Sequence, residues 1–158
     1  MKKLLPILLF LLISTAALSQ SIITGKVVSV ADGDTFTILT EGNKQVKIRF
    51  YGIDCPENGQ DFGTKAKQFT SSLAFSKTVS IQIKDLDRYG RTIGIVILPD
   101  STILNEELLK AGLAWHYKYY DKSEKYAALE NEAKVRKVGI WSMINQIAPW
   151  EFRRIGYE

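Results

Sequence analysis

Cysteine and histidine are nearly absent from this chain of 158 residues, which contains one of each. The single cysteine, Cys55, excludes a disulfide within the chain, so packing has to hold the fold together. Cys55 and His116 alone cannot form the cysteine and histidine clusters that bind zinc or iron–sulfur groups. The sequence therefore argues against a site of either kind.

A strong charge of one sign is also missing. Lysine and arginine number 21 against 17 acidic residues, which gives a formal net charge of +4. A balance so close to neutral does not by itself indicate a polyanionic partner. The case for such a partner has to come from local groups of charged and aromatic side chains.

Long apolar runs are confined to the N-terminus. Lys2 and Lys3 precede an apolar run over 4–12, and small residues follow over 14–19. This pattern predicts a secretory signal peptide over 1–19, with a mature start at Gln20. The run is shorter than the roughly 20 residues that span a bilayer, which favours cleavage over a retained anchor. We therefore expect a secreted or periplasmic protein with no stable membrane association after cleavage.

The remaining residues, 20–158, contain no repeat, linker or low-complexity segment, which predicts one domain. Alternating apolar residues and turn signals predict strands over 22–30, 35–39, 46–50, 79–83 and 93–97. Helical spacing and caps predict helices over 64–75, 103–110 and 121–138, the last with Asp121 and Glu124 as a capping box. This order predicts an α+β fold, mainly β: a five-stranded OB-fold barrel with three helices. The order alone also permits other α+β sandwiches.

Three charged residues of opposed sign lie close together in the segment 49–57, RFYGIDCPE. Arg49 lies on the polar face of a predicted strand, while Asp54 and Glu57 follow on a turn that Pro56 stiffens. An arginine can hold phosphate oxygens, one carboxylate can bind a hard metal and a second can accept a proton. The alternative is that the two carboxylates only cap or turn the chain.

A second acidic segment is Asp32-Gly33-Asp34-Thr35, which lies between two predicted strands. Seen alone it is an ordinary turn, but Asp34 begins a strand just after it, where a carboxylate can face a cation. The segment is not an EF-hand loop, because Thr37 and Asn43 stand where that loop requires glycine and glutamate.

The predicted hairpin tip 87–91, DRYGR, carries mixed charge, and such a tip is usually only solvated. Two arginines and a tyrosine on one loop are nevertheless what a phosphate clamp needs.

Aromatic and basic residues are interleaved over 115–120, WHYKYY. Such a segment can stack bases while its cations hold the backbone, at about 1–3 kcal/mol per stacked base. We expect Trp115 and Tyr117 to pack beneath the helices and Tyr120 to be the better ligand contact. His116 is not expected to act as acid or base, because the carboxylates and arginines already supply a base and cations.

Five segments together resemble the staphylococcal (micrococcal, thermonuclease) nuclease family. They are DGDT at 32–35, RFYGIDCPE at 49–57, DRYGR at 87–91, LNEELLKAGLA at 104–114 and GIWS at 139–142. One of these would be a weak signal, but five in the family's order and at compatible spacing are a strong one. The similarity spans about 24–142 and leaves 143–158 as an extension. Its segment 149–154, PWEFRR, could pack on the barrel or add basic surface, and we expect it to pack.

The resemblance implies an OB-fold phosphodiesterase that depends on Ca²⁺, cleaves DNA and RNA and leaves 3′-phosphate products. It implies that Asp34, Asp54 and the backbone carbonyl of Cys55 bind the cation, and that Glu57 orients or deprotonates the attacking water. Arg49 and Arg91 would hold the phosphate. The implied substrate-binding residues are Arg88 and Tyr89 at a terminal phosphate, Tyr120 at a base or sugar, and Lys118.

The sequence departs from the family's type member at two of these positions. Cys55 replaces a threonine, a change that a ligand acting through its backbone carbonyl should tolerate. Lys118 replaces one of the two tyrosines of the nucleotide pocket. The loop after Glu57 is also shorter here.

Two functions follow from these observations. The first is a secreted, monomeric, calcium-dependent nuclease that prefers single-stranded or denatured substrates. The second is a non-catalytic OB-fold module that binds single-stranded nucleic acid. Such a module needs aromatic and basic residues, but it does not need Asp34, Asp54 and Glu57 together, so their joint presence favours the enzyme.

Overall fold

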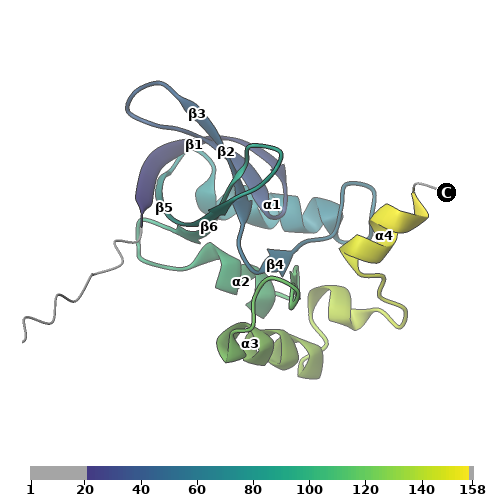
Figure 1. The fold of residues 1–158 in the computed structure, drawn as a ribbon. Helices are drawn as coiled ribbons and strands as arrows, with labels where there is room; N and C mark the ends of the chain where they lie inside the picture. Colours follow the sequence, from purple (N-terminus) through teal and green to yellow (C-terminus); the bar gives the residue numbers. More distant parts are fainter. Residues whose placement is uncertain (1–20, 157–158) are drawn as a thin grey trace, which may run out of the picture.

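The computed structural model describes residues 21–156, so the predicted signal peptide lies outside the described residues. The elements are β1 (Ile22–Asp32), β2 (Thr35–Leu39), β3 (Gln45–Phe50), β4 (Ile53–Asp54), α1 (Gly63–Ala74), β5 (Thr78–Leu86), β6 (Thr92–Ile97), α2 (Leu104–Lys110), β7 (Trp115–His116), α3 (Glu124–Val135), the 3₁₀ turn η1 (Gly139–Ser142) and α4 (Pro149–Ile155). Figure 1 shows the barrel above α2 and α3, with α4 at one side. No helix within 21–156 has the length and apolar character needed to cross a bilayer.

Five strands close into a barrel in the order β1-β2-β3-β6-β5. Neighbouring strands run antiparallel except β3 and β6, which are parallel. The predicted α+β fold with a five-stranded barrel is therefore confirmed. The core follows from the alternation in the sequence: Ile48 and Phe50 of β3 are buried, while Arg49 between them reaches the surface in part. The rings of Phe36 and Phe50 meet edge to face, 5.0 Å apart between centroids, inside the barrel.

A second sheet of two short strands joins the barrel to the helices below it. Here β4 pairs antiparallel with β7, so that Ile53 lies opposite His116 and Asp54 opposite Trp115. The backbone N–H of Tyr117 also donates to the carbonyl of Gly52 at 2.9 Å. The pairing places the charged segment 49–57 beside the aromatic segment 115–120, which are more than fifty residues apart in the chain.

Two features of the C-terminal half differ from the sequence-based expectation. Helix α3 begins at Glu124, because Ser123 and not Asp121 caps it, accepting from the N–H of Tyr126 at 3.1 Å. The helix also ends at Val135, before the predicted position 138. A fourth helix, α4, lies in the extension, where Pro149 occupies the first turn. Its seven residues are too few to show a clear helical periodicity in the sequence.

A buried asparagine ties α2 to the barrel. The side-chain oxygen of Asn105 accepts from the N–H of Val96 at 2.9 Å, and its side-chain nitrogen donates to the carbonyl of Tyr51 at 2.9 Å. Asn105 is fully buried, so no water can replace either bond. It therefore fixes both β6 and the chain that leads from β3 to β4.

We predict that Asn105→Ala lowers the free energy of unfolding by about 2–4 kcal/mol, since it leaves two buried backbone groups without partners. Urea denaturation followed by circular dichroism measures this change. The control is Asn131→Ala, at an exposed position of α3, which should change stability by less than about 0.5 kcal/mol. Equal stability of the two variants would contradict the role given to Asn105.

Candidate active site

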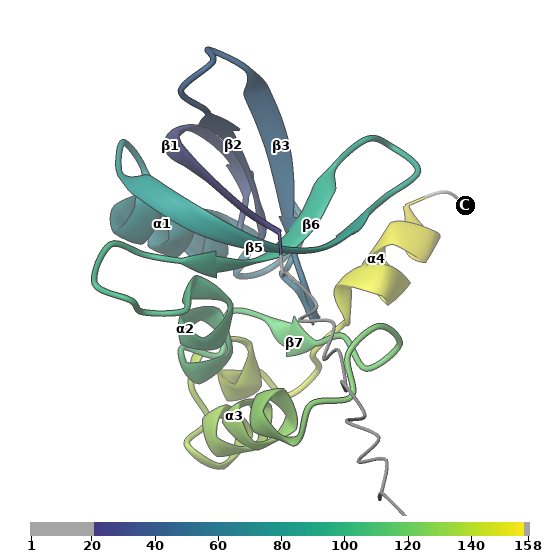
Figure 2. The same ribbon diagram turned by 60° about the vertical axis from the view of Figure 1, so that its left-hand side comes forward.

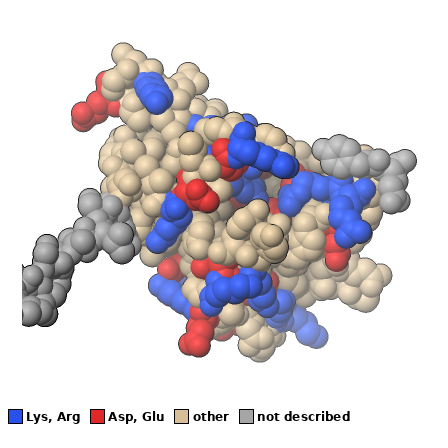
Figure 3. Space-filling view, viewed as in Figure 1, with Lys and Arg blue, Asp and Glu red and all other residues tan. Residues whose placement is uncertain are grey.

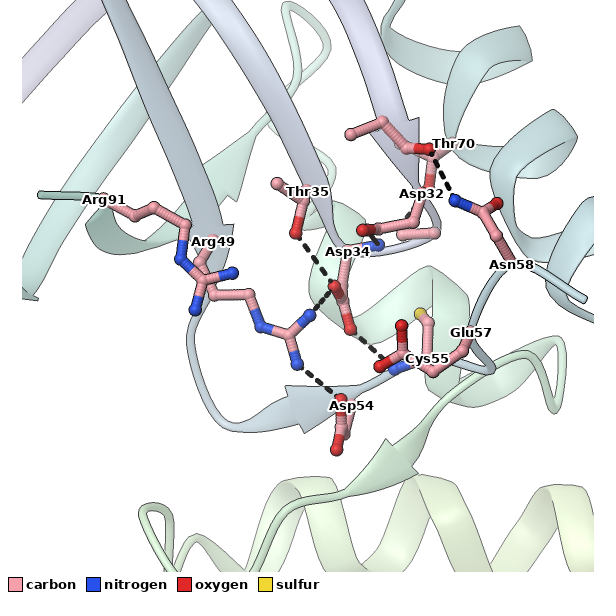
Figure 4. Close-up of polar contacts among 12 residues, drawn as sticks. Asp32, Asp34, Thr35, Arg49, Asp54, Cys55, Glu57, Asn58, Thr70 and Arg91 are labelled. Carbon is pink, nitrogen blue, oxygen red and sulfur yellow. Dashed lines mark hydrogen bonds and ion pairs between the residues drawn. The ribbon is translucent and has the colours of Figure 1, made fainter. Parts of the chain in front are cut away.

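The strand register brings three of the predicted site residues to one end of the barrel. Thr35 of β2 lies opposite Arg49 of β3, so Asp34 is next to that arginine. Arg49 in turn lies opposite Ile93 of β6, two residues after Arg91. Figure 4 shows the guanidinium groups of Arg49 and Arg91 on the same side of Asp34. Residues from three separate motifs therefore meet because the barrel closes.

Arg49 bridges the two aspartates that the sequence predicts as metal ligands. One of its terminal nitrogens donates to Asp34 and the other to Asp54 (Figure 4). Both aspartates are almost completely buried, at 1% and 0% exposure. Burying an unpaired carboxylate is costly, so the shared guanidinium offsets the loss of hydration.

Asp34 is held further by its neighbours. Its second carboxylate oxygen accepts from the backbone N–H of Cys55 at 2.6 Å, and the hydroxyl of Thr35 donates to the first at 3.2 Å. The turn before it is tightly packed, because a Cβ on Gly33 would lie 2.7 Å from that of Ala66 and 2.8 Å from that of Cys55. The glycine of the DGDT segment thus allows Cys55 to approach the turn.

The thiol of Cys55 is buried and takes no part in an ion pair. Burial raises the pKa of this thiol well above its usual value, and the neighbouring Asp32, Asp54 and Glu57 raise it too, against the lowering effect of Arg49. The thiol is therefore protonated at neutral pH and serves as a small packing group. Only the backbone of Cys55 remains for a ligand role.

The donor set at this point suits a hard cation. Asp34 and Asp54 converge on one guanidinium, so their oxygens lie within reach of a single positive centre. Among residues 21–156, no three acidic, cysteine or histidine side chains form a metal-binding group by themselves. A cation here would be held by the two carboxylates and the carbonyl of Cys55, with water and substrate oxygens completing the 6–8 ligands that Ca²⁺ takes.

Glu57 lies on a short, ordered loop beside the two aspartates. Its N–H donates to the side-chain oxygen of Gln60 at 3.0 Å, and its carbonyl accepts from the N–H of the same residue at 3.0 Å. A Cβ on Gly63 would lie 2.0 Å from that carbonyl, so only glycine permits the start of α1 to pack there. The Glu57 carboxylate is 31% exposed and faces the cleft, where a water molecule can reach it.

The hairpin between β5 and β6 orients Arg91. Asp87 accepts from the N–H groups of Tyr89 and Arg91 at 2.9 Å each and from Nε of Arg91 at 2.7 Å. Burial acts to raise the pKa of Asp87, but these hydrogen bonds outweigh it and lower the pKa overall. Arg88 and Tyr89 lie at the exposed tip, where the arginine donates to the tyrosine hydroxyl at 2.7 Å.

The aromatic segment divides between the cleft and the interior. Tyr117 and Tyr120 line the cleft, and their rings meet edge to face at 5.2 Å. The expectation that Tyr117 packs beneath the helices is therefore wrong, because the β4–β7 pairing turns the chain after His116 toward the cleft. Trp115 is buried, as the sequence predicts. His116 is also buried and pairs with Asp121 at 2.8 Å, away from the cleft lining. Lys118 is not among the described residues that line the cleft, and its Nζ lies 3.6 Å from Oε2 of Glu130.

These groups surround an open cleft of about 720 Å³. Its described lining includes four arginines and four acidic residues: Arg49, Arg88, Arg91 and Arg153, and Asp32, Glu57, Asp85 and Asp87. Figure 3 shows basic side chains on both sides of a hollow on this face of the molecule. A cleft of this kind offers cations to an anionic ligand and aromatic rings to a flat one.

Several residues of the described cleft lining were not predicted as site residues, and Asp32 and Arg153 are two of the charged ones. Asp32 lines the cleft and accepts from the N–H of Asp34 at 3.2 Å, and its burial raises the pKa of its carboxyl group. The sequence signal that could have indicated Asp32 as a site residue is its position two residues before Asp34. The side chain of Arg153 reaches the cleft from α4, and no sequence pattern in residues 143–158 indicates that it points there.

Comparison with known proteins agrees with this geometry. A family model described as staphylococcal nuclease homologue matches residues 47–143. A protein of Haemophilus influenzae named "Uncharacterized endonuclease" is 40% identical over 153 residues, which cover 97% of this chain and 85% of that protein. A protein of Shigella flexneri named "Micrococcal nuclease" is 38% identical over 141 residues, which cover 82% of this chain and 80% of that protein. The chain belongs to the staphylococcal nuclease family.

Proposed function

We propose that the protein is a secreted, calcium-dependent nuclease that hydrolyses phosphodiester bonds in DNA and RNA. The observation that carries the proposal is the convergence of Asp34, Asp54 and Glu57 with Arg49 and Arg91 at one end of the barrel. Family membership and relatives named as nucleases support hydrolysis of nucleic acid. A module that only binds single strands does not require three carboxylates beside its phosphate-binding arginines.

The chemical difficulty is the negative charge of the phosphodiester, which repels a nucleophile. In the proposed reaction Arg49 and Arg91 each bind phosphate oxygens, and their forked donors follow the phosphorus as it becomes five-coordinate. These contacts strengthen as charge builds up in the transition state. A bound cation would supply further positive charge at the same oxygens.

Glu57 is the proposed general base. Its carboxylate lies in the cleft, on the loop that Gln60 holds, and can accept a proton from an attacking water. Tyr120 is exposed in the cleft and offers a ring face to an unstacked base, which favours single-stranded or denatured substrates. We further propose that a monomer acts after removal of residues 1–19, and that the products carry 3′-phosphates.

We predict that activity depends on a divalent cation. The purified mature protein should degrade denatured DNA with Ca²⁺ and lose this activity with a chelator, because Asp34 and Asp54 then lack the cation that they are proposed to hold. Acid-soluble nucleotide release measures the reaction, and added Ca²⁺ should restore it. Full activity in excess chelator would contradict the proposed cation dependence, and no activity with Ca²⁺, Mg²⁺ or Mn²⁺ would contradict the nuclease itself.

Removal of the proposed base should slow the reaction strongly. We expect Glu57→Gln to lower kcat by about 10²–10⁴-fold, because the variant keeps the size of the side chain but cannot accept a proton. The control is Asp61→Asn, at an exposed position of the same loop, which should retain wild-type activity. A Glu57→Gln enzyme with a wild-type rate would exclude Glu57 as the base.

Removal of the second phosphate-binding arginine should have a comparable effect. We expect Arg91→Gln to lower kcat/KM by about 10²–10³-fold, the usual cost of one donor to a developing negative charge. Arg136→Gln, on the exposed end of α3, removes the same charge outside the described cleft lining and should change kcat/KM little. Equal rates for the two variants would show that Arg91 does not contact the phosphate.

A further inference from the structure

Helix α4 places a third arginine against the carboxylates of the proposed active site. Nη2 of Arg153 donates to Oδ2 of Asp54 at 2.8 Å, and its Nη1 lies 3.3 Å from Oδ1 of the same residue. Nη1 also donates to Oε1 of Glu57. One guanidinium therefore bridges the proposed metal ligand and the proposed base.

The position of Arg153 depends on contacts made by the start of α4. The indole of Trp150 stacks on the ring of Tyr117, with centroids 5.3 Å apart and planes inclined by 13°. Ala148 is buried in a small apolar cluster with Trp115 and Ile140, against which Trp150 also packs. The side-chain nitrogen of Gln60 donates to the carbonyl of Ile147 at 2.6 Å. Figure 2 shows α4 above the loop that follows β7. The helix is therefore docked as one wall of the cleft.

Arg153 lies outside the part of the chain that matches the family model, which ends at residue 143. It also differs from Arg49 in how firmly it is placed. The Arg49 side chain is 16% exposed and comes from a strand of the barrel, whereas that of Arg153 is 38% exposed and comes from a peripheral helix. Of the two guanidinium groups that hold Asp54, Arg153 is thus the easier one to displace.

A guanidinium and a divalent cation cannot share Asp54 without cost. Arg49 and Arg153 together contact both oxygens of this carboxylate. A cation that binds there has to break the Arg153 contacts or accept the repulsion of a positive charge a few ångströms away. Removing Arg153 takes one positive charge away from the Asp54 and Glu57 carboxylates, which strengthens their attraction for a cation.

We propose that Arg153 is a positioning residue that competes with the cation for Asp54 and Glu57. The proposal rests on the function proposed above. In the cation-free protein Arg153 holds the two carboxylates in place and offsets their charge. When a cation binds, the guanidinium is released from Asp54 but stays in the cleft, where it faces the phosphates of the substrate. Arg153 thus weakens cation binding and strengthens binding of the nucleic acid.

The opposite signs of these two effects make the proposal testable. Isothermal titration calorimetry with Ca²⁺ should show that Arg153→Gln binds the cation more tightly than the wild type, on the order of tenfold, within the range usual for coupled sites. A fluorescent single-stranded phosphorothioate oligonucleotide, which resists cleavage, should bind more weakly to the same variant when Ca²⁺ is saturating. General damage to the site would weaken both interactions together.

The matched control is Arg154→Gln, which removes the same charge from an exposed position of the same helix and should leave both affinities unchanged. A second variant, Trp150→Leu, removes the stacking on Tyr117 without touching a carboxylate and should also tighten Ca²⁺ binding. If circular dichroism shows that Arg153→Gln is unfolded, the Ca²⁺ affinity of Trp150→Leu tests the proposal instead. Tighter binding than in the wild type would support it, and unchanged or weaker binding would overturn it.

Unchanged or weaker Ca²⁺ binding in Arg153→Gln, or equal tightening in Arg154→Gln, would overturn the proposal. Absence of Ca²⁺ binding in both the wild type and Arg153→Gln would overturn it as well. Nuclease assays on the same preparations keep the two questions apart. A wild type without nuclease activity in which Arg153→Gln still tightens Ca²⁺ binding would refute only the proposed function.

Discussion

The site depends on the burial of two aspartates around one guanidinium. Asp34 and Asp54 are almost fully shielded from water, and Arg49 bridges them at the mouth of the barrel. Buried carboxylates repel each other and lose hydration, so they can lie this close only with positive charge between them. Arg153 supplies a second guanidinium at Asp54 and Glu57, so with Asp32 nearby the carboxylates still outnumber the arginines that contact them.

The barrel supplies this arrangement through strand register. Each charged residue lies at or just beyond a strand end, where one side chain is free of the core while its neighbours are fixed in it. Phe50 is packed against Phe36, and this contact leaves Arg49 directed toward Asp34. The polar site is therefore positioned by apolar contacts that are adjacent to it in sequence.

The sequence was most informative where a local pattern determines structure. Alternation in the strand 46–50 predicted which face Arg49 occupies, and the resemblance to the nuclease family implied that Asp34, Arg49 and Arg91 belong together. The pairing of β4 with β7 could not be predicted, because each strand has only two residues, which is too short for an alternating pattern in the sequence. Arg153 was missed for a similar reason: its position follows from the stacking of Trp150 on Tyr117, a contact between distant segments. Asp121 was predicted to cap α3, but its carboxylate pairs with the imidazole of His116, a contact that the helix signals in the sequence do not indicate.

The short β4–β7 ladder has one more consequence. Asp54 lies in one of its strands, and the other leads directly into the tyrosines of the cleft, so a carboxylate and a ring platform share one small rigid unit. A ligand that contacts these rings and a ligand that contacts Asp54 would therefore bind to the same pair of strands.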